Sequence, residues 1–262
     1  MDFELGGKCV VVTGGARGQG AAEVAALAAA GADVIAVDVA DDAGLSLAAS
    51  LAERCAAGQG MVTYRHLDVS RQEAWTAFAG DLRERQREVH GLVNNAGVAQ
   101  RSRIGEIDLG EWNDTIAVNL TGTMLGMQAL APLMRPGASI VNVGSVAALG
   151  SHHGAAYTAA KWAVRGLTRS AATELGRSGI RVNVIHPGLV HTPLTASAPP
   201  AFIRAHLSLT PLARPGEAGE IAQTVLFLLS SASSYLTGAE IAVDGGYSAH
   251  GGGKLLSDAA RG

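Results

Sequence analysis

The sequence contains few lysines and almost no excess of one charge. Only Lys8, Lys161 and Lys254 are lysines, and 20 basic against 23 acidic residues leave a formal net charge of −3. A surface that binds nucleic acid or an anionic membrane would carry a cluster of basic residues. The Arg-rich stretch 83–88 is interleaved with glutamates, which is typical of a solvated helix face. We therefore expect neither a nucleic-acid partner nor a membrane partner.

Cysteines, leader signals and long apolar runs are also scarce. Cys9 and Cys55 are the only cysteines, and they form no Cys-x-x-Cys pair. Cys9 lies within an apolar run, so we expect a buried free thiol and a reducing compartment. The N-terminus lacks the basic and apolar regions of a signal peptide, and no apolar run approaches the ~20 residues of a membrane span. These features predict a soluble, cytoplasmic protein.

The sequence does contain an alternation of short apolar runs with longer, alanine-rich stretches. The apolar runs are residues 9–12, 33–38, 61–67, 91–93, 139–143, 180–185 and 240–243. The helix-like stretches are residues 20–30, 41–56, 71–88, 111–134, 155–177 and 217–230. Runs that are apolar throughout are typical of strands buried on both faces of a parallel sheet. The pattern predicts an α/β fold with a seven-stranded parallel sheet and helices on both faces.

The segment 189–215 interrupts this alternation. It holds five of the eight prolines and is longer than an ordinary α/β connection. A long segment after the carboxyl end of a strand is where a substrate lid would lie, and a tolerated surface insertion is the alternative. Because no linker divides the chain, we predict one domain over 1–248, with a substrate loop at about 189–215 and a flexible, glycine-rich tail over 249–262.

A glycine-rich turn follows the first apolar run. Its glycines are Gly14, Gly18 and Gly20. A dinucleotide pyrophosphate needs backbone N–H groups at a helix N-terminus, with no Cβ in the way. Gly14 would allow the tight turn, Gly18 would let the backbone approach the phosphates, and Gly20 would let the helix pack on the strand. Because the turn lies between an expected strand and helix, it predicts a Rossmann-type dinucleotide site.

Asp38 suggests which dinucleotide binds. It ends the second apolar run, where a carboxylate can accept hydrogen bonds from the adenosine ribose hydroxyls and would repel a 2′-phosphate. Arg17 in the turn could instead pair with that phosphate. Because Asp38 lies where the hydroxyls should be, we predict NAD rather than NADP; a turn or helix cap is the alternative role for Asp38. Asp68, after the third run, could contact the adenine ring or cap the next helix, as could Ser70.

Tyr157 and Lys161 lie four residues apart in a helix-like stretch, so they share one helix face. An ammonium group beside a phenol favours the phenolate and lowers its pKa from about 10. A tyrosine tuned in this way can move a proton near neutral pH. The scarcity of lysine makes a chance pairing less frequent, so the pair predicts a general acid/base.

These motifs together resemble the short-chain dehydrogenase/reductase family over about residues 5–248. The resemblance is carried by Thr13-Gly14-x-x-x-Gly18-x-Gly20, Asn94-Asn95-Ala96-Gly97, Asn119, Ser145, Tyr157-x-x-x-Lys161, Pro187-Gly188 and Asp244-Gly245-Gly246. Segments 161–167, 186–188 and 234–240 are similar to the bacterial hydroxysteroid dehydrogenase branch. The resemblance implies a Rossmann fold and hydride transfer between a nicotinamide and a carbonyl carbon.

The resemblance also implies a role for each site residue. Tyr157 would be the general acid/base, Ser145 would bond the same substrate oxygen, Lys161 would lower the Tyr157 pKa and hold the nicotinamide ribose, and Asn119 would position a water beside Lys161. Asn94 and Gly97 would line the adenosine side, and Thr192 with the Val190 backbone would contact the carboxamide. The full expected cofactor set is Gly14, Arg17, Gly18, Gln19, Gly20, Asp38, Asp68, Val69, Asn95, Ala96, Gly97, Tyr157, Lys161, Pro187, Gly188, Val190 and Thr192.

Plainer roles remain open for the catalytic residues. Asn119 could be a buried polar group bonded to a neighbouring backbone, Ser145 could only cap, and Tyr157 could be a core residue. No spacing of carboxylates or cysteines supports a metal site, and loop or pocket-lining roles are expected for His152, His153 and His191.

The leading hypothesis is an NAD(H)-dependent enzyme that interconverts a secondary alcohol and a ketone, with a hydroxysteroid-like or other bulky hydrophobic substrate. One alternative is an NADPH-dependent 3-oxoacyl-thioester reductase, whose acyl carrier would favour a basic rim; Arg101, Arg103, Arg204 and Arg214 are candidates. Another is a dinucleotide sensor without catalysis. The apolar stretches 111–134 and 155–177, by resemblance, would pair across two-fold axes and form a homotetramer.

Overall fold

The computed structural model describes residues 3, 5–54 and 60–260. Cys55 and the predicted end of the second helix at residue 56 lie outside the described residues. Cys9 is a buried free thiol, as its apolar surroundings predict.

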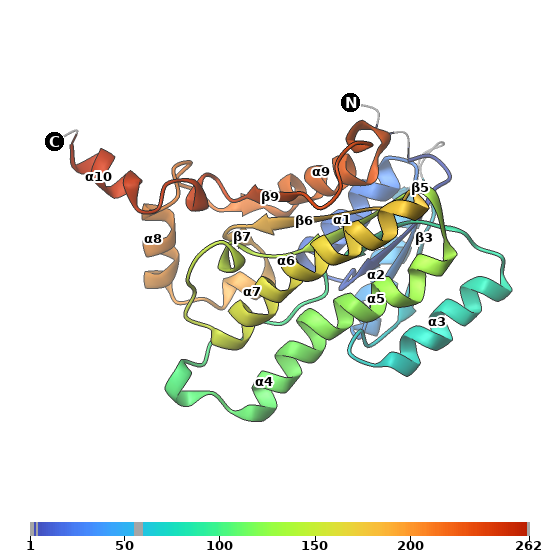
Figure 1. The fold of residues 1–262 in the computed structure, drawn as a ribbon, viewed down its shortest axis with the longest axis horizontal. Helices are drawn as coiled ribbons and strands as arrows, with labels where there is room; N and C mark the ends of the chain where they lie inside the picture. Colours follow the sequence, from blue (N-terminus) through green and yellow to red (C-terminus); the bar gives the residue numbers. More distant parts are fainter. Residues whose placement is uncertain (1–2, 4, 55–59, 261–262) are drawn as a thin grey trace.

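A parallel sheet of seven strands forms the centre of the molecule, which confirms the predicted fold class (Figure 1). Its strands lie in the order β3-β2-β1-β4-β5-β6-β9. Their bounds are β1 (Cys9–Thr13), β2 (Asp33–Asp38), β3 (Val62–His66), β4 (Val89–Asn94), β5 (Met134–Val143), β6 (Arg181–Pro187) and β9 (Glu240–Val243). The order reverses between β1 and β4, so the loops after these two strands diverge and leave a crevice at their carboxyl ends.

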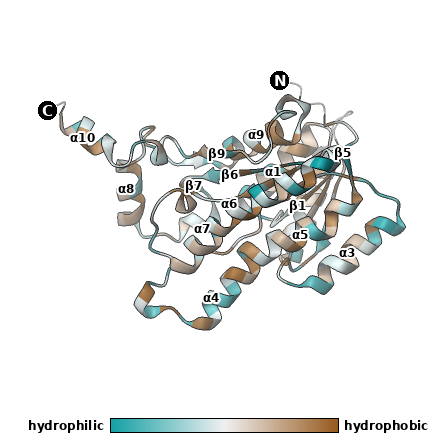
Figure 2. Cartoon of the chain, viewed as in Figure 1, coloured by the Kyte–Doolittle hydropathy of each residue, from teal (hydrophilic) through white to brown (hydrophobic). Residues whose placement is uncertain are grey.

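Helices cover both faces of the sheet. On one face lie α1 (Gly18–Ala29), α2 (Asp41–Arg54) and α9 (Ala218–Leu229), which share an apolar core with alternate side chains of the strands. On the other face, α3 (Gln72–Glu84), α5 (Gly122–Leu130) and α6 (Ala155–Leu175) build a second core around Trp75. Among the strands between these layers, β1 is brown in Figure 2, because it is buried on both sides and mostly apolar.

The predicted helix over 111–134 is divided in the structure. It comprises α4 (Leu109–Ile116), a π-helical turn (Ala117–Thr121), α5 and a 3₁₀ turn (Ala131–Leu133). It begins early because the Asp108 side chain caps it, accepting from the Gly110 and Glu111 N–H groups. It ends early because β5 already starts at Met134, so the predicted strand at 139–143 was too short at its beginning.

This segment also corrects the expectation about apolar runs. By length and composition alone, the helical stretch Leu109–Leu133 is long and apolar enough to cross a membrane. It packs against α3 and α6, with Gly126 against the Trp75 ring. Such packing is typical of a core helix in an α/β protein.

The segment 189–215 is folded rather than an open loop. β7 (Val190–His191) pairs with β8 (Gly216–Glu217) at its two ends, and α7 (Pro193–Ala196) and α8 (Pro200–Ser208) lie between them. Pro193 and Pro200 each stand at the first turn of a helix, where a missing N–H costs nothing. Two of the five prolines that suggested a loop therefore start helices.

The tail contains α10 (Gly253–Ala259), which extends from the body beyond α8 in Figure 1. Its flexibility stays a prediction. Short 3₁₀ turns complete the described chain: η1 (Ile104–Glu106), η4 (Val146–Ala148), η5 (Gly176–Ser178), η6 (Ser231–Ser233) and η7 (Tyr247–Ala249).

Candidate active site

A cavity of about 690 Å³ opens at the carboxyl ends of the strands. All predicted site residues except Asn94 and Asn119 line it, from Gly14 in the first turn to Thr192 before α7. Motif reading missed several further lining residues: Val39, Leu67, Ser70, Val98, Asp114, Ala117, Val118, Val143, Gly144, Pro193 and Thr195. Most of these adjoin a predicted residue in the sequence, so extending each motif by one or two positions would have found them.

The glycine-rich turn presents bare backbone to this cavity. Among the residues that the structure describes, no side chain caps the N-terminus of α1, so its first N–H groups are available to an anionic ligand. Gly18 has φ +56°, and a Cβ added there would meet only Pro193 and Thr192, at 3.5 Å or more, so backbone conformation rather than space requires glycine. A Cβ on Gly20 would overlap the Gly14 carbonyl oxygen. The turn therefore fits the pyrophosphate of a dinucleotide.

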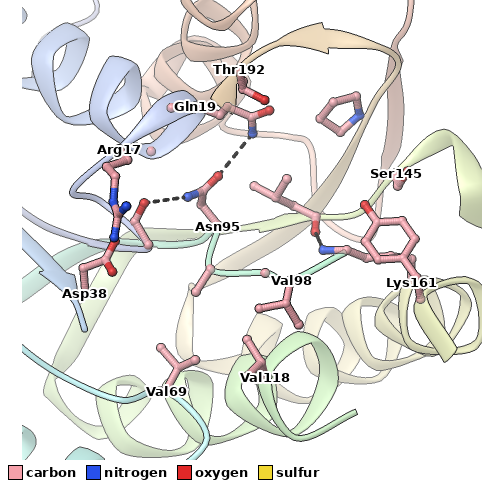
Figure 3. Close-up of a pocket in the computed structure, with 18 of the residues that line it drawn as sticks. Arg17, Gln19, Asp38, Val69, Asn95, Val98, Val118, Ser145, Lys161 and Thr192 are labelled. Atoms are coloured by element: carbon pink, nitrogen blue, oxygen red, sulfur yellow. Dashed lines mark hydrogen bonds between the residues drawn. The ribbon is translucent and has the colours of Figure 1, made fainter. Parts of the chain in front are cut away.

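Asn95 joins the loops after β1 and β4. Its Nδ2 donates to the carbonyl oxygens of Thr13 (3.0 Å) and Gly14 (3.2 Å). Its Oδ1 accepts from Gln19 Nε2 (3.3 Å), a bond drawn as a dashed line in Figure 3. The neighbouring Asn94 does not line the cavity, contrary to expectation. Its side chain points into the protein and donates to Asn142 Oδ1 at 2.9 Å, because adjacent residues of a strand face opposite sides.

Asp38 and Arg17 lie at the same end of the cavity (Figure 3). Asp38 Oδ1 accepts from the N–H groups of Val39 (2.8 Å) and Ala40 (3.1 Å), and Oδ2 accepts from the Ala16 N–H (3.1 Å). The carboxylate therefore does cap a turn, and it also ties the glycine-rich turn to β2. Oδ2 accepts only one of these bonds and can accept another, so the carboxylate can still bind a ribose hydroxyl.

Asp68 lines the cavity but does not cap the following helix. Its Oδ1 accepts from the Ser70 N–H (3.0 Å) and hydroxyl (2.7 Å). Helix α3 starts after Arg71 without any side-chain cap, so the capping alternative for Asp68 and Ser70 is wrong. The two residues instead close a tight turn, because a short acidic side chain can bond the backbone two residues ahead.

Ser145 and Tyr157 face each other across the inner end of the cavity. Ser145 follows β5 and caps η4, since its Oγ accepts from the Ala147 N–H at 3.1 Å. Tyr157 stands in the first turn of α6. Burial raises the pKa of Tyr157, and a hydrogen bond from Ser145 acts in the opposite direction. Loss of hydration outweighs the effect of Ser145, so the net direction is upward, and the lowering of this pKa by Lys161 stays a prediction.

Lys161 is buried one helical turn after Tyr157. Its Nζ donates to the Val143 carbonyl oxygen at 2.7 Å and lies 5.7 Å from the centre of the Tyr157 ring. Burial lowers the pKa of Lys161 to about 8, so the ammonium form still predominates at neutral pH. The helix thus places a positive charge directly behind the tyrosine.

Asn119 lies behind the cavity wall, within the π-helical turn, and is 1% exposed. Its Oδ1 accepts from the Val98 N–H (2.8 Å), and its Nδ2 donates to the Val98 carbonyl oxygen (2.9 Å). The alternative role, a buried polar group bonded to backbone, is therefore what the structure shows. This pair of bonds fixes the loop after Gly97, which forms part of the cavity lining.

A row of aromatic and imidazole rings continues from Tyr157 toward α8. His152 lies 5.8 Å from Tyr157 and 6.4 Å from Phe202 (ring centres), and His206 stacks on Tyr247 at 4.1 Å. Burial lowers the pKa of His152 to about 4, so this ring is neutral at pH 7. Within 3, 5–54 and 60–260, no group of three or more His, Cys, Asp or Glu could hold a metal ion.

Comparison with known proteins is consistent with this geometry. A family model described as enoyl-(acyl carrier protein) reductase matches residues 14–248. A trans-4-hydroxycyclohexanecarboxylate dehydrogenase of Sinomonas cyclohexanicum is 43% identical, with 96% of each chain covered. The chain belongs to the short-chain dehydrogenase/reductase family. It is thus an oxidoreductase, and dehydrogenases of this family use a nicotinamide dinucleotide.

Other short-chain dehydrogenases/reductases are similar over most of their length. A 3-alpha-(or 20-beta)-hydroxysteroid dehydrogenase of Mycobacterium tuberculosis is 44% identical, covering 94% of this chain and 91% of its own. A solved short-chain type dehydrogenase/reductase from Mycobacterium ulcerans has a TM-score of 0.86 and 34% identity, covering 93% of this chain and 90% of its own. The predicted family and fold are confirmed.

Proposed function

We propose that the protein is an NAD(H)-dependent dehydrogenase that interconverts a secondary alcohol and a ketone on a bulky, ring-bearing substrate. The observation that carries the proposal is the meeting of Ser145, Tyr157 and Lys161 in one cavity with the glycine-rich turn of α1. That combination supplies a proton donor next to a dinucleotide site, which a sensor without catalysis would not require. The proposed domain covers 1–248, with 189–215 as its substrate segment and 249–262 as a flexible tail.

The proposed chemistry divides between the protein and its cofactor. A bound nicotinamide would supply or accept the hydride. In the direction of reduction, the neutral Tyr157 hydroxyl donates a proton to the carbonyl oxygen, and the Ser145 hydroxyl bonds the same oxygen. The Lys161 ammonium stabilises the phenolate that remains. Because burial favours the neutral phenol, Tyr157 holds its proton until a substrate oxygen is in place.

Asp38 supports NAD rather than NADP. Its carboxylate lies at the carboxyl end of β2 in the cavity lining, where it would accept from ribose hydroxyls and repel a phosphate. The thioester-reductase alternative has weaker support. Arg101 bonds the Ser197 carbonyl oxygen at 3.1 Å, and Arg214 holds Glu220 at 2.7 and 2.8 Å, so these two arginines are engaged within the protein.

The row of rings beside Tyr157 supports a ring-bearing substrate. Rings at His152, Phe202 and His206 offer flat, uncharged surfaces next to the reacting position. The two relatives named above act, by their names, on a hydroxycyclohexanecarboxylate and on hydroxysteroids, both of which are ring-bearing compounds. We infer that a secondary alcohol on a ring-bearing skeleton is the substrate class.

Assembly and location are further parts of the proposal. Leu109 and Met124 are exposed on α4 and α5, and Trp162 is exposed on α6. These are the helices for which pairing across two-fold axes was expected, and their apolar surface supports a homotetramer. Light scattering that shows a monomer would contradict it. A cytoplasmic location remains a prediction from the sequence.

The test is a panel of ketones and alcohols assayed with NADH, NADPH and their oxidised forms. Cyclohexanols, trans-4-hydroxycyclohexanecarboxylate and hydroxysteroids form one set, and acyclic secondary alcohols and a 3-oxoacyl thioester are the comparison sets. We expect turnover of ring substrates with NADH and a weaker reaction with NADPH. Thermal stabilisation by NADH without turnover of any compound would support the sensor, and an NADPH preference with the thioester would support the reductase.

A further inference from the structure

A buried histidine lies directly behind Ser145 and outside the cavity. His186, the second-last residue of strand β6 and directly before Pro187, is 0% exposed. Residue 144 must be glycine for the imidazole to fit, because a Cβ there would overlap His186 Nδ1. Burial removes the imidazole from water and lowers its pKa. Because burying a polar ring is unfavourable unless its nitrogens have polar partners, the contacts of both nitrogens matter.

The Nδ1 atom of His186 faces the backbone of Ser145. It lies 3.3 Å from the Ser145 nitrogen and 3.1 Å from the Ser145 oxygen. Among the described residues, Nε2 on the opposite side of the ring has no hydrogen-bond partner, and it lies 3.7 Å from Glu240 Oε2. The ring thus bridges a catalytic-loop backbone and a carboxylate.

Glu240, on β9, forms ion pairs with two arginines of α6. Its Oε2 lies 2.8 Å from Arg165 Nε, and its Oε1 lies 2.8 Å from an Arg169 terminal nitrogen. Arg165 also donates to the Ala148 carbonyl oxygen at 2.6 Å, at the end of the turn that Ser145 caps. Arg165 is two helical turns after Tyr157, so the network joins the serine turn to the helix that carries the tyrosine.

The carboxylate determines where the imidazole proton lies. A neutral imidazole protonated on Nδ1 would turn the lone pair of Nε2 toward the negative charge of Glu240, which is unfavourable. With the proton on Nε2, the ring faces Glu240 with its positive edge, and Nδ1 accepts from the Ser145 N–H (3.3 Å). The competing arrangement, in which Nδ1–H donates to the Ser145 carbonyl oxygen (3.1 Å), leaves the Nε2 lone pair facing the carboxylate. The backbone of Ser145 is then fixed from behind, while its hydroxyl is oriented in front by the Ala147 N–H and Tyr157.

We propose that His186, oriented by Glu240, is a positioning residue that holds the Ser145 backbone so that its hydroxyl meets the substrate oxygen. The expected effect on kcat rests on the proposed function, whereas the contact between His186 and the Ser145 backbone does not depend on it. His186 acts only through Ser145, and it touches neither cofactor nor substrate.

The experiment compares His186→Leu, which removes the acceptor, with His186→Asn, whose amide oxygen can take the place of Nδ1. Each variant is made in the wild-type chain and in Ser145→Ala, and kcat is expressed per NADH-binding site so that unfolded protein is not counted. We expect His186→Leu to lower kcat by about 10- to 100-fold with KM for NADH changed little, and His186→Asn to recover most of the loss. In the Ser145→Ala chain, His186→Leu should change kcat by less than about twofold.

Three further measurements make the outcome decisive. Glu240→Gln should lower kcat in the same direction, since the proton position is no longer enforced, and the exposed His66→Gln serves as a control. Hydrogen–deuterium exchange should show faster exchange of the Ser145 amide in His186→Leu than in wild type or His186→Asn, whether or not any substrate turns over.

Unchanged kcat, an equal loss in the Ser145→Ala chain, or unchanged Ser145 exchange would each overturn the inference. Wild-type protein without turnover, but with the expected exchange difference, would refute the proposed function only.

Discussion

Glu23 offers a stability prediction whose size follows from its burial. This glutamate of α1 is 0% exposed, and Gln19 Nε2 donates to its Oε1 at 3.1 Å. In the described part of the chain its Oε2 has no hydrogen-bond partner. Burial raises the pKa of Glu23 from 4.5 to about 8, so the folded protein holds a proton there at pH 7 and the unfolded chain does not.

The sign and size of the effect follow from this difference in bound protons. Between pH 4.5 and about 8 the folded state binds more protons than the unfolded state, so stability falls as pH rises through that window. At pH 7, holding the proton costs about 3 kcal/mol, at 1.36 kcal/mol for each pH unit above the unfolded pKa. Glu23→Gln keeps the shape and the bond from Gln19 but needs no proton. We expect it to stabilise the protein by about 3 kcal/mol at pH 7 and by under about 1 kcal/mol near pH 4.5.

Urea unfolding and thermal melting at pH 4.5, 6, 7 and 8 measure this effect. The gain at pH 7 corresponds to a rise in Tm of roughly 6–12 °C for a domain of this size. The exposed Glu174→Gln serves as the matched control and should change stability by less than about 0.5 kcal/mol. If Glu23→Gln and wild type lose stability with the same dependence on pH, the carboxyl is not protonated in the folded state and the reasoning is wrong.

The other predictions concern the proposed active site. Tyr157→Phe should retain NADH binding and lower kcat by about 10²–10⁴-fold, because the proton donor is gone; near-normal kcat would rule out the tyrosine. Lys161 loses its charge as pH rises through about 8, so ketone reduction should decline above that pH, and a rate–pH profile that stays level to pH 10 would exclude its role. Phe202→Ala should raise KM for a hydroxysteroid at least about fivefold and leave KM for an acyclic alcohol unchanged; equal changes for both would place Phe202 away from the substrate.

The sheet was predictable from the sequence because each strand is a short apolar run, and such runs recur along the chain. Strand β1, for example, is buried at every position and almost wholly apolar, and burial on both faces of a parallel sheet favours that pattern. The boundaries of helices and strands were harder to predict where one element follows another directly, as the 3₁₀ turn ending at Leu133 is followed by β5 from Met134. The segment 189–215 was misread because Pro193 and Pro200 are equally compatible with a loop and with the first turn of a helix.

The candidate site was predictable in its membership but not in its contacts. Glycine spacing and the Tyr157–Lys161 interval are constraints of backbone geometry, so they are visible in sequence. The facing direction of Asn94 and the partner of Asn119 depend on segments far away in the chain, which no spacing reveals. The raised pKa of Tyr157 depends on burial by its whole surroundings, which the interval to Lys161 does not reveal.

The separation between α6 and the segment 190–217 has a practical consequence. Tyr157, Lys161 and Arg165 recur every four residues on one rigid helix, whereas Phe202 and His206 lie on α8, which joins the core through the two-residue pairing of β7 with β8. An engineer could therefore exchange α8, residues 200–208, as a cassette and leave the proton-handling residues and the glycine-rich turn in place. The same division would allow relatives to acquire new ring systems as substrates by changing one short insert while the rest of the fold stays constant.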